Sequence, residues 1–177
     1  MAKMAIDSDT AHSLTRLLMA TAFMIAAILC SQSRNRGVAF FFFLSTIETY
    51  AKLRYPFHNR ARDFLLTFVP DELSKTDVQS LLMIALVTVI LLGVIFLPSR
   101  LARYGPARSK IYLGACTTFI LLCVEMVSIH SVDAFLYAID GPFVRCGWAY
   151  ACAAMLSAIG ARQITKNRMK PVSRPSR

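Results

Sequence analysis

Glu125 is the residue whose place in the sequence most needs a chemical explanation. It stands within the apolar stretch LLCVEMV, which covers residues 121–127. Because a carboxylate surrounded by hydrocarbon costs several kcal/mol, this side chain is expected to face the interior of a helix bundle, where it is protonated, paired or hydrated. It could then belong to a proton or cation pathway, or it could be a protonated acid that hydrogen-bonds a neighbouring helix. The sequence favours neither reading.

Further polar residues flank the same end of the apolar stretches. Asp133 lies two helical steps of four residues beyond Glu125, so both acids share one helix face, and Glu48 and Lys52 have the i,i+4 spacing of a helical pair. We therefore predict a polar cluster on one side of the membrane, made of Glu48, Lys52, Glu125, His130, Asp133 and Arg145. The alternative is that most of these groups are solvated loop charges and that the Glu48 and Lys52 pair adds little stability.

No other residues are spaced for a recognisable reaction. The sequence contains no defensible Ser/His/Asp, Cys/His or paired-carboxylate arrangement, and its three histidines cannot be assembled by spacing into a zinc or haem site. The cysteines lack a CxxC motif, so we expect buried thiols rather than a metal or redox centre. The sequence thus predicts no catalytic residue, no metal and no cofactor, and it points away from an enzyme without excluding one.

The composition explains which elements must position these residues. The chain has 177 residues, of which 56% are hydrophobic and 17% charged, and its mean hydropathy is +0.52. Such a chain is too apolar for an ordinary soluble domain of this length and predicts an all-α integral membrane protein. The net charge of +10 lies between apolar runs, where lipid headgroups and topology explain it better than nucleic acid does.

Four apolar runs are long enough to cross a bilayer, at about residues 17–32, 78–98, 111–131 and 146–161. The run at residues 38–51, which includes four consecutive phenylalanines, is shorter and lies between Arg36 and Lys52. It either spans the membrane, with both basic side chains reaching outward to the headgroups, or forms a re-entrant or interfacial helix. The fold predicted is a bundle of five transmembrane helices, with four as the alternative.

The remaining segments complete a single domain over residues 1–161. The first apolar run lacks the small residues of a cleavage site, so we expect a retained span rather than a signal peptide. Within the connection at residues 52–77, the sequence FLLTFV is too short to span and predicts an amphipathic segment on the membrane surface. Residues 162–177, which carry six bases and no acid, are expected to form a disordered basic tail.

The distribution of basic residues predicts the orientation. Residues 99–110 and the C-terminal tail are rich in Arg and Lys and contain no acid, so both are expected in the cytoplasm. The long connection and the loop that holds Asp133 and Asp140 then face outward. The number of bases inside is the same for four and five spans, so the side of the N-terminus stays open. We expect a bacterial inner membrane protein whose C-terminus is cytoplasmic.

Small residues recur every fourth position on the first and last spans. The series are Ala22, Ala26, Cys30 and Ala149, Ala153, Ser157, Ala161. Such faces let helices approach closely within the chain, or dock on another membrane subunit or a second copy. The leading hypothesis is a non-enzymatic helper or small subunit of a membrane complex. Its rival is a small proton- or cation-coupled transporter that uses the predicted polar cluster.

Overall fold

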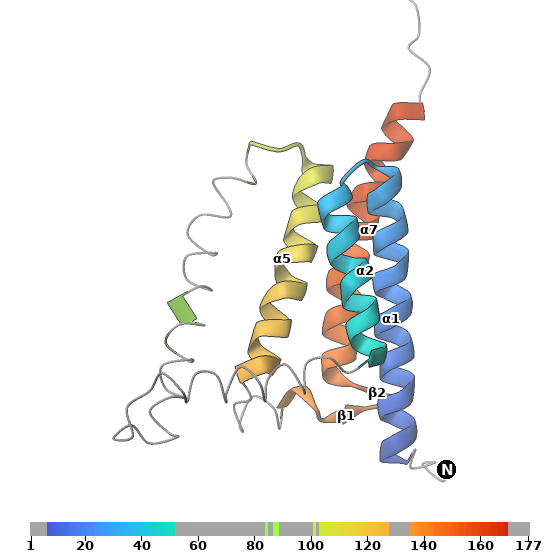
Figure 1. Ribbon diagram of the computed structural model, residues 1–177, viewed down its shortest axis with the longest axis vertical. Helices are drawn as coiled ribbons and strands as arrows, with labels where there is room; N and C mark the ends of the chain where they lie inside the picture. The colour runs from blue at the N-terminus through green and yellow to red at the C-terminus, as the bar shows by residue number, and fades with distance from the viewer. Residues whose placement is uncertain are drawn as a thin grey trace, which may run out of the picture.

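The computed structural model describes residues 7–51, 84, 87–88, 101, 103–127 and 135–169 (Figure 1). Four helices make up most of this part of the chain: α1 (Ser8–Gln32), α2 (Arg36–Ala51), α5 (Pro106–Val127) and α7 (Arg145–Met169). A two-stranded hairpin of β1 (Ile139–Asp140) and β2 (Phe143–Val144) precedes α7.

The helices form a bundle in which α1 packs against both α2 and α7, and α5 packs against α7 (Figure 1). Helices α1 and α7 run in one direction, and α2 and α5 run in the opposite direction. A tight turn joins α1 to α2. Arg34 adopts a left-handed backbone conformation with φ of 64°, and the Asn35 amide donates to the Cys30 carbonyl at 2.9 Å. This bond satisfies a carbonyl that the end of the helix leaves without an intrahelical partner. The turn therefore reverses the chain within three residues and places α2 alongside α1.

Glycine and serine residues allow the backbones of α5 and α7 to come into direct contact. A Cβ atom at Gly114 would collide with the Ala153 carbonyl and the Ser157 hydroxyl, and one at Gly160 would collide with the Ala107 carbonyl. Ser157 Oγ donates a hydrogen bond of 2.8 Å to the Ile111 carbonyl across this contact. The small-residue face predicted on the last span is thus used for packing within the chain.

The hairpin before α7 is fastened to α1. Gly141, with φ of +66°, and Pro142 form the two-residue turn between β1 and β2, as the sequence DGPF predicts. The Val144 amide then donates to Thr15 Oγ1 at 2.8 Å, while the same hydroxyl donates to the Ala11 carbonyl at 2.7 Å. The start of α7 is therefore fixed to the first half of α1.

The interior is built mainly from small side chains around one aromatic layer. Phe23, Phe42 and Tyr150 are fully buried, with the Phe23 ring 5.9 Å from Phe42 and 5.8 Å from Tyr150 between centroids. The buried alanines of α1 and α7 surround this layer. Large apolar side chains, in contrast, lie on the outside: Leu17, Ile28, Phe40 and Phe119 are each at least half exposed.

The helices extend beyond the apolar runs of the sequence. Helix α1 begins at Ser8, before the run at residues 17–32, and α5 begins at Pro106, before the run at residues 111–131. Residues 162–169, expected in a disordered tail, continue α7 to Met169. In each case the additional helical turns are polar, so they lengthen the helix without lengthening the apolar run.

The all-α prediction is confirmed for the residues that the structure describes. By length and composition, α1 and the Pro106–Glu125 part of α5 could each cross a membrane. The doubtful run at residues 38–51 is helical as part of α2. The expected amphipathic segment within residues 52–77 and, apart from residues 84, 87 and 88, the expected span at residues 78–98 lie outside the described residues.

Candidate functional site

The two ends of the bundle differ in charge. The end formed by the α1–α2 turn, the start of α5 and the end of α7 carries only basic side chains among the charged residues described there. These are Arg34, Arg36, Arg103, Arg108, Lys110, Arg162, Lys166 and Arg168. All acids of the described ranges lie toward the opposite end: Asp7, Asp9, Glu48, Glu125 and Asp140. We call these the basic end and the acidic end.

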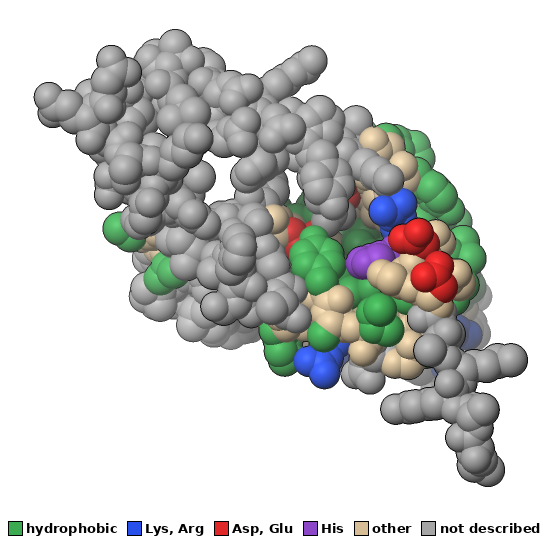
Figure 2. Space-filling model, turned by 90° about the horizontal axis from the view of Figure 1, so that it is seen from below, with side chains coloured by type: hydrophobic (Ala, Val, Ile, Leu, Met, Phe, Trp, Pro, Cys, Tyr) green, Lys and Arg blue, Asp and Glu red, His purple; other side chains and the backbone are tan. Residues whose placement is uncertain are grey.

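A cavity of about 460 Å³ lies at the acidic end, between the helices. One wall comes from α1, through Asp9, His12, Ser13, Thr15, Arg16 and Met19. The other walls come from Glu48 and Thr49 of α2, Glu125 of α5, Tyr137, and Cys146 of α7. Figure 2 shows acidic, basic and histidine side chains gathered at this end of the molecule.

The polar first turns of α1 present one face to the cavity. Asp9, His12 and Arg16 recur at intervals of three and four residues, which places them one above another on a helix. The helix extends this far because the Ala11 amide donates to the Asp7 carbonyl at 3.0 Å, and Asp9 in the first turn complements the helix dipole. These polar first turns of α1, which precede the apolar run, therefore form one wall of the cavity.

The two glutamates reach the cavity from different helices. Glu48 lies one turn before the end of α2, and Glu125 lies in the last turn of α5; both are partly buried. Tyr150 of α7 donates its hydroxyl hydrogen to Glu125 Oε2 at 3.0 Å. This bond fixes the orientation of the Glu125 carboxylate relative to the bundle core.

The aromatic layer lies on the basic side of the cavity. On α1, Phe23 follows the cavity residue Met19 by one helical turn, and on α7, Tyr150 follows Cys146 by one turn. On α2, Phe42 lies between one and two turns above Glu48 and Thr49. All three rings are fully buried, and Phe23 packs against both of the others, so the layer ties α1, α2 and α7 together next to the cavity.

The structure brings together part of the predicted cluster. Glu48 and Glu125 line the same cavity. Arg145 begins α7 beside Cys146, but it is not among the residues that line the cavity; its guanidinium carbon lies 5.1 Å from the centre of the Phe135 ring. The other three members, Lys52, His130 and Asp133, lie outside the described residues.

Sequence reasoning missed Asp9, His12 and Arg16. Their helical spacing is a usable signal, but these residues precede the apolar run at residues 17–32. Among the residues with described placement, no group of three or more His, Cys, Asp or Glu side chains is arranged to hold a metal ion. The expected burial of the cysteines holds for Cys30 and Cys146, whereas Cys116 and Cys123 are partly buried and Cys152 is exposed.

Comparison with models of protein families, with curated proteins and with solved structures gives no significant match. Arguments about function therefore depend on the geometry of this chain.

Proposed function

We propose that the protein is a multi-pass protein of a bacterial inner membrane, with the basic end in the cytoplasm. The observation that carries this proposal is where small and large side chains lie. Small residues make up most of the interior, and many large apolar residues face outward, which is the opposite of the usual arrangement in a soluble protein. Phe40 is 61% exposed and Leu17 56%, whereas Ala26, Ala154 and Ala161 are fully buried. Such an extensive apolar exterior is unusual for a soluble monomer and suits contact with acyl chains.

Helix lengths agree with this placement. The 25 residues of α1 extend roughly 37 Å and the 16 residues of α2 roughly 24 Å, compared with a hydrocarbon core of about 30 Å. The shorter helix can still cross, because Arg36 at its start can extend toward the headgroups. With residues 78–98 as a further span, the chain crosses five times, with its N-terminus outside.

The charge of the two ends supports the orientation. Bases concentrate on the cytoplasmic side of membrane proteins, because moving them outward opposes the membrane potential. Arg34, Arg108 and Lys166 come from three separate segments, yet all lie at the end where the described residues include no acid. This end is therefore assigned to the cytoplasm, and the cavity opens toward the outside.

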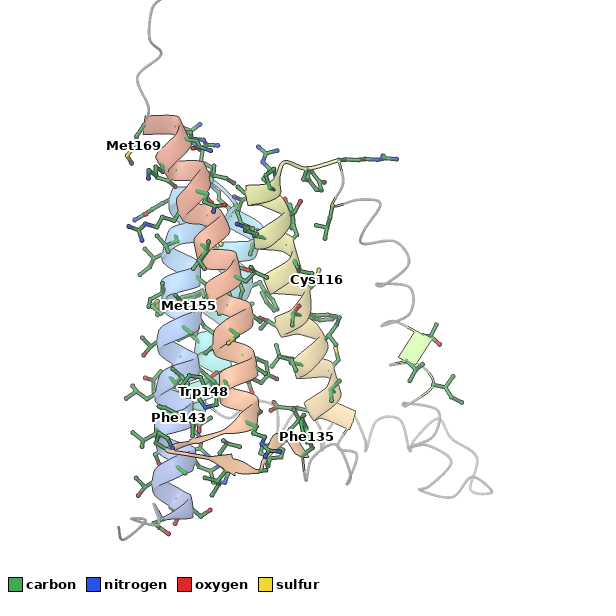
Figure 3. All side chains as sticks on the ribbon, turned by 180° about the vertical axis from the view of Figure 1, so that it is seen from behind. Cys116, Phe135, Phe143, Trp148, Met155 and Met169 are labelled. Atoms are coloured by element: carbon green, nitrogen blue, oxygen red, sulfur yellow. The ribbon has the colours of Figure 1, made fainter. Side chains whose placement is uncertain are left out.

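Trp148, the one tryptophan of the sequence, gives a direct test of the membrane placement. It is 45% exposed near the acidic end, with its ring 5.0 Å from Phe143 (Figure 3). In vesicles, we expect lipids brominated near the headgroup to quench its fluorescence more than lipids brominated near the bilayer centre. A C-terminal fusion to green fluorescent protein should fluoresce in cells, and one to alkaline phosphatase should be inactive. Recovery of the chain in the aqueous phase without detergent, or an active phosphatase fusion, would overturn the proposal.

Within the membrane, the proposed role is that of a non-enzymatic helper or small subunit of a larger complex. The buried aromatic layer supports this role, because packed apolar rings lie between the cavity and the basic end. Native purification in a mild detergent should yield a complex with another membrane protein or a second copy. A monodisperse monomer with no partner would contradict this role.

A second candidate is a small proton- or cation-coupled transporter. The meeting of Glu48 and Glu125 in one cavity favours it, since acids in membrane bundles often belong to ion pathways. Transport would require the layer of Phe23, Phe42 and Tyr150 to open. pH-dependent uptake into vesicles that is abolished by Glu125→Gln would favour the transporter, and uptake unchanged by that substitution would exclude it as stated.

A further inference from the structure

Two lysines lie at the basic end, where the start of α5 meets the end of α7. Lys110 Nζ donates a hydrogen bond of 3.3 Å to Gln163 Oε1, and Lys166 follows Gln163 by three residues, which places it on the same face of α7. A Cβ atom at Gly160 would collide with the Ala107 carbonyl, so the two helices are in backbone contact beside these side chains. This contact holds the side chains of the two helices at a fixed separation.

No acid of the described chain lies near these lysines. Residues 78–124 and 141–177, which include all of α7 and α5 as far as Val124, contain no acid. Glu125 lies 15 residues after Lys110, roughly 22 Å along the helix. The other acids with described placement also lie at the acidic end. The described surroundings of Lys110 and Lys166 are therefore basic, and they complement a negatively charged partner.

Exposed apolar side chains continue from these lysines toward the acidic end. Leu113 follows Lys110 by three residues on α5, and Ile159 precedes Gln163 by four residues on α7. Each therefore lies one helical turn away on the same helix face, and the two side chains are 42% and 46% exposed, respectively. Basic groups at one level and apolar groups at the next match a phospholipid, whose phosphate and acyl chains follow in that order. A free phosphate would have no use for the apolar part.

We propose that Lys110, Gln163 and Lys166 bind the headgroup phosphate of an anionic phospholipid, whose acyl chains lie along Leu113 and Ile159. The bond to Gln163 uses one of the three ammonium donors of Lys110, so the same group can also donate to a phosphate oxygen. Because Gln163 Oε1 accepts that bond, its amide nitrogen is left to donate to the phosphate as well. This inference rests on the proposed membrane placement and names the lipid that the basic end selects.

The test uses the full-length protein in a mild nonionic detergent. Phosphatidylglycerol is the probe, and phosphatidylcholine with the same acyl chains is the comparison without net charge. We expect native mass spectrometry to show that phosphatidylglycerol binds more tightly. Lys110→Gln should weaken its binding about fivefold, the contribution of one basic residue close to an anionic lipid. Lys166→Gln should act in the same direction and serves as the second variant if Lys110→Gln does not fold.

Arg108→Gln is the matched control. Arg108 is an exposed base at the same end of α5, but it precedes Lys110 by two residues and so faces another side of the helix. Its replacement should change phosphatidylglycerol binding by less than about twofold, as expected for a screened surface charge. Equal weakening by Arg108→Gln and Lys110→Gln would overturn the inference, because general attraction by the basic end would then explain the binding.

Two further outcomes would also overturn it. One is equal binding of the two lipids to the unaltered protein. The other is displacement of phosphatidylglycerol by an equal concentration of glycerol 3-phosphate, which carries the phosphate without acyl chains and would indicate a site for free phosphate. If the chain requires detergent but binds both lipids equally, only this inference fails. If the chain is recovered in the aqueous phase without detergent, the membrane placement itself fails.

Discussion

The pair formed by α5 and α7 is closed at one end and open at the other. Toward the basic end, Gly114 and Gly160 let the two backbones touch, and Ser157 links them by a hydrogen bond. Toward the acidic end α5 leans away from α7, and the link is made by the longer side chains of Tyr150 and Glu125 (Figures 1 and 3). Small residues thus allow α5 and α7 to pack closely toward the basic end, while the longer side chains of Tyr150 and Glu125 connect the two helices where they lie farther apart, beside the cavity.

The largest expected effect comes from filling the closed end. In Gly114→Val, the new side chain would overlap the Ala153 carbonyl and Ser157, so α5 must move away from α7. We expect a loss of about 3 kcal/mol in the free energy of unfolding, measured by denaturation in mixed detergent micelles. Gly37→Val is the control, because a Cβ there meets nothing within 4 Å; a comparable loss in both variants would contradict the close contact.

A smaller loss is expected where the hairpin is fastened beside the cavity. Thr15→Val keeps the shape of the side chain but leaves the buried Val144 amide without its acceptor. An unsatisfied buried donor costs about 2 kcal/mol, so thermal unfolding should shift downward accordingly. Thr46→Val removes a hydroxyl that bonds only to the Phe42 carbonyl of its own helix, and it should cost clearly less. Equal effects would mean that the bond to Val144 contributes nothing.

The link at the open end is tested by Tyr150→Phe. This variant keeps the buried ring beside Phe23 but removes the donor to Glu125. We expect a loss of about 1.5 kcal/mol in the same unfolding assay, a value in the range for a buried side-chain hydrogen bond. Tyr50→Phe, at a tyrosine that is 65% exposed, should leave the free energy of unfolding unchanged.

The sequence predicts the closed end better than the open one. Alanines, serine and glycine at helical spacing indicate close packing directly, and the last-span series is buried as expected at Ala153, Ser157 and Ala161. Glu48 and Glu125 could be placed together because each lies near the same end of its helix. The wall formed by Asp9, His12 and Arg16 could not be predicted, since polar helical turns do not stand out in a hydropathy profile. The side that these turns present depends on tertiary packing, which includes the bond from Val144 to Thr15.

The smallest expected effect is a gain at the α1–α2 turn, which sets how α2 meets the rest of the bundle. Arg34 adopts a left-handed backbone conformation, which is unfavourable for residues with a Cβ atom and favourable for glycine. Arg34→Gly should therefore raise the free energy of unfolding by about 1 kcal/mol, whereas Arg34→Ala, which also removes the charge but keeps the Cβ, should give no gain. If both variants behave alike, the turn is not strained at Arg34, and the charge rather than the backbone determines stability there. If only the glycine variant raises the free energy of unfolding, the backbone at Arg34 carries a conformational cost. An arginine that helps to set the membrane orientation would explain why that cost is retained.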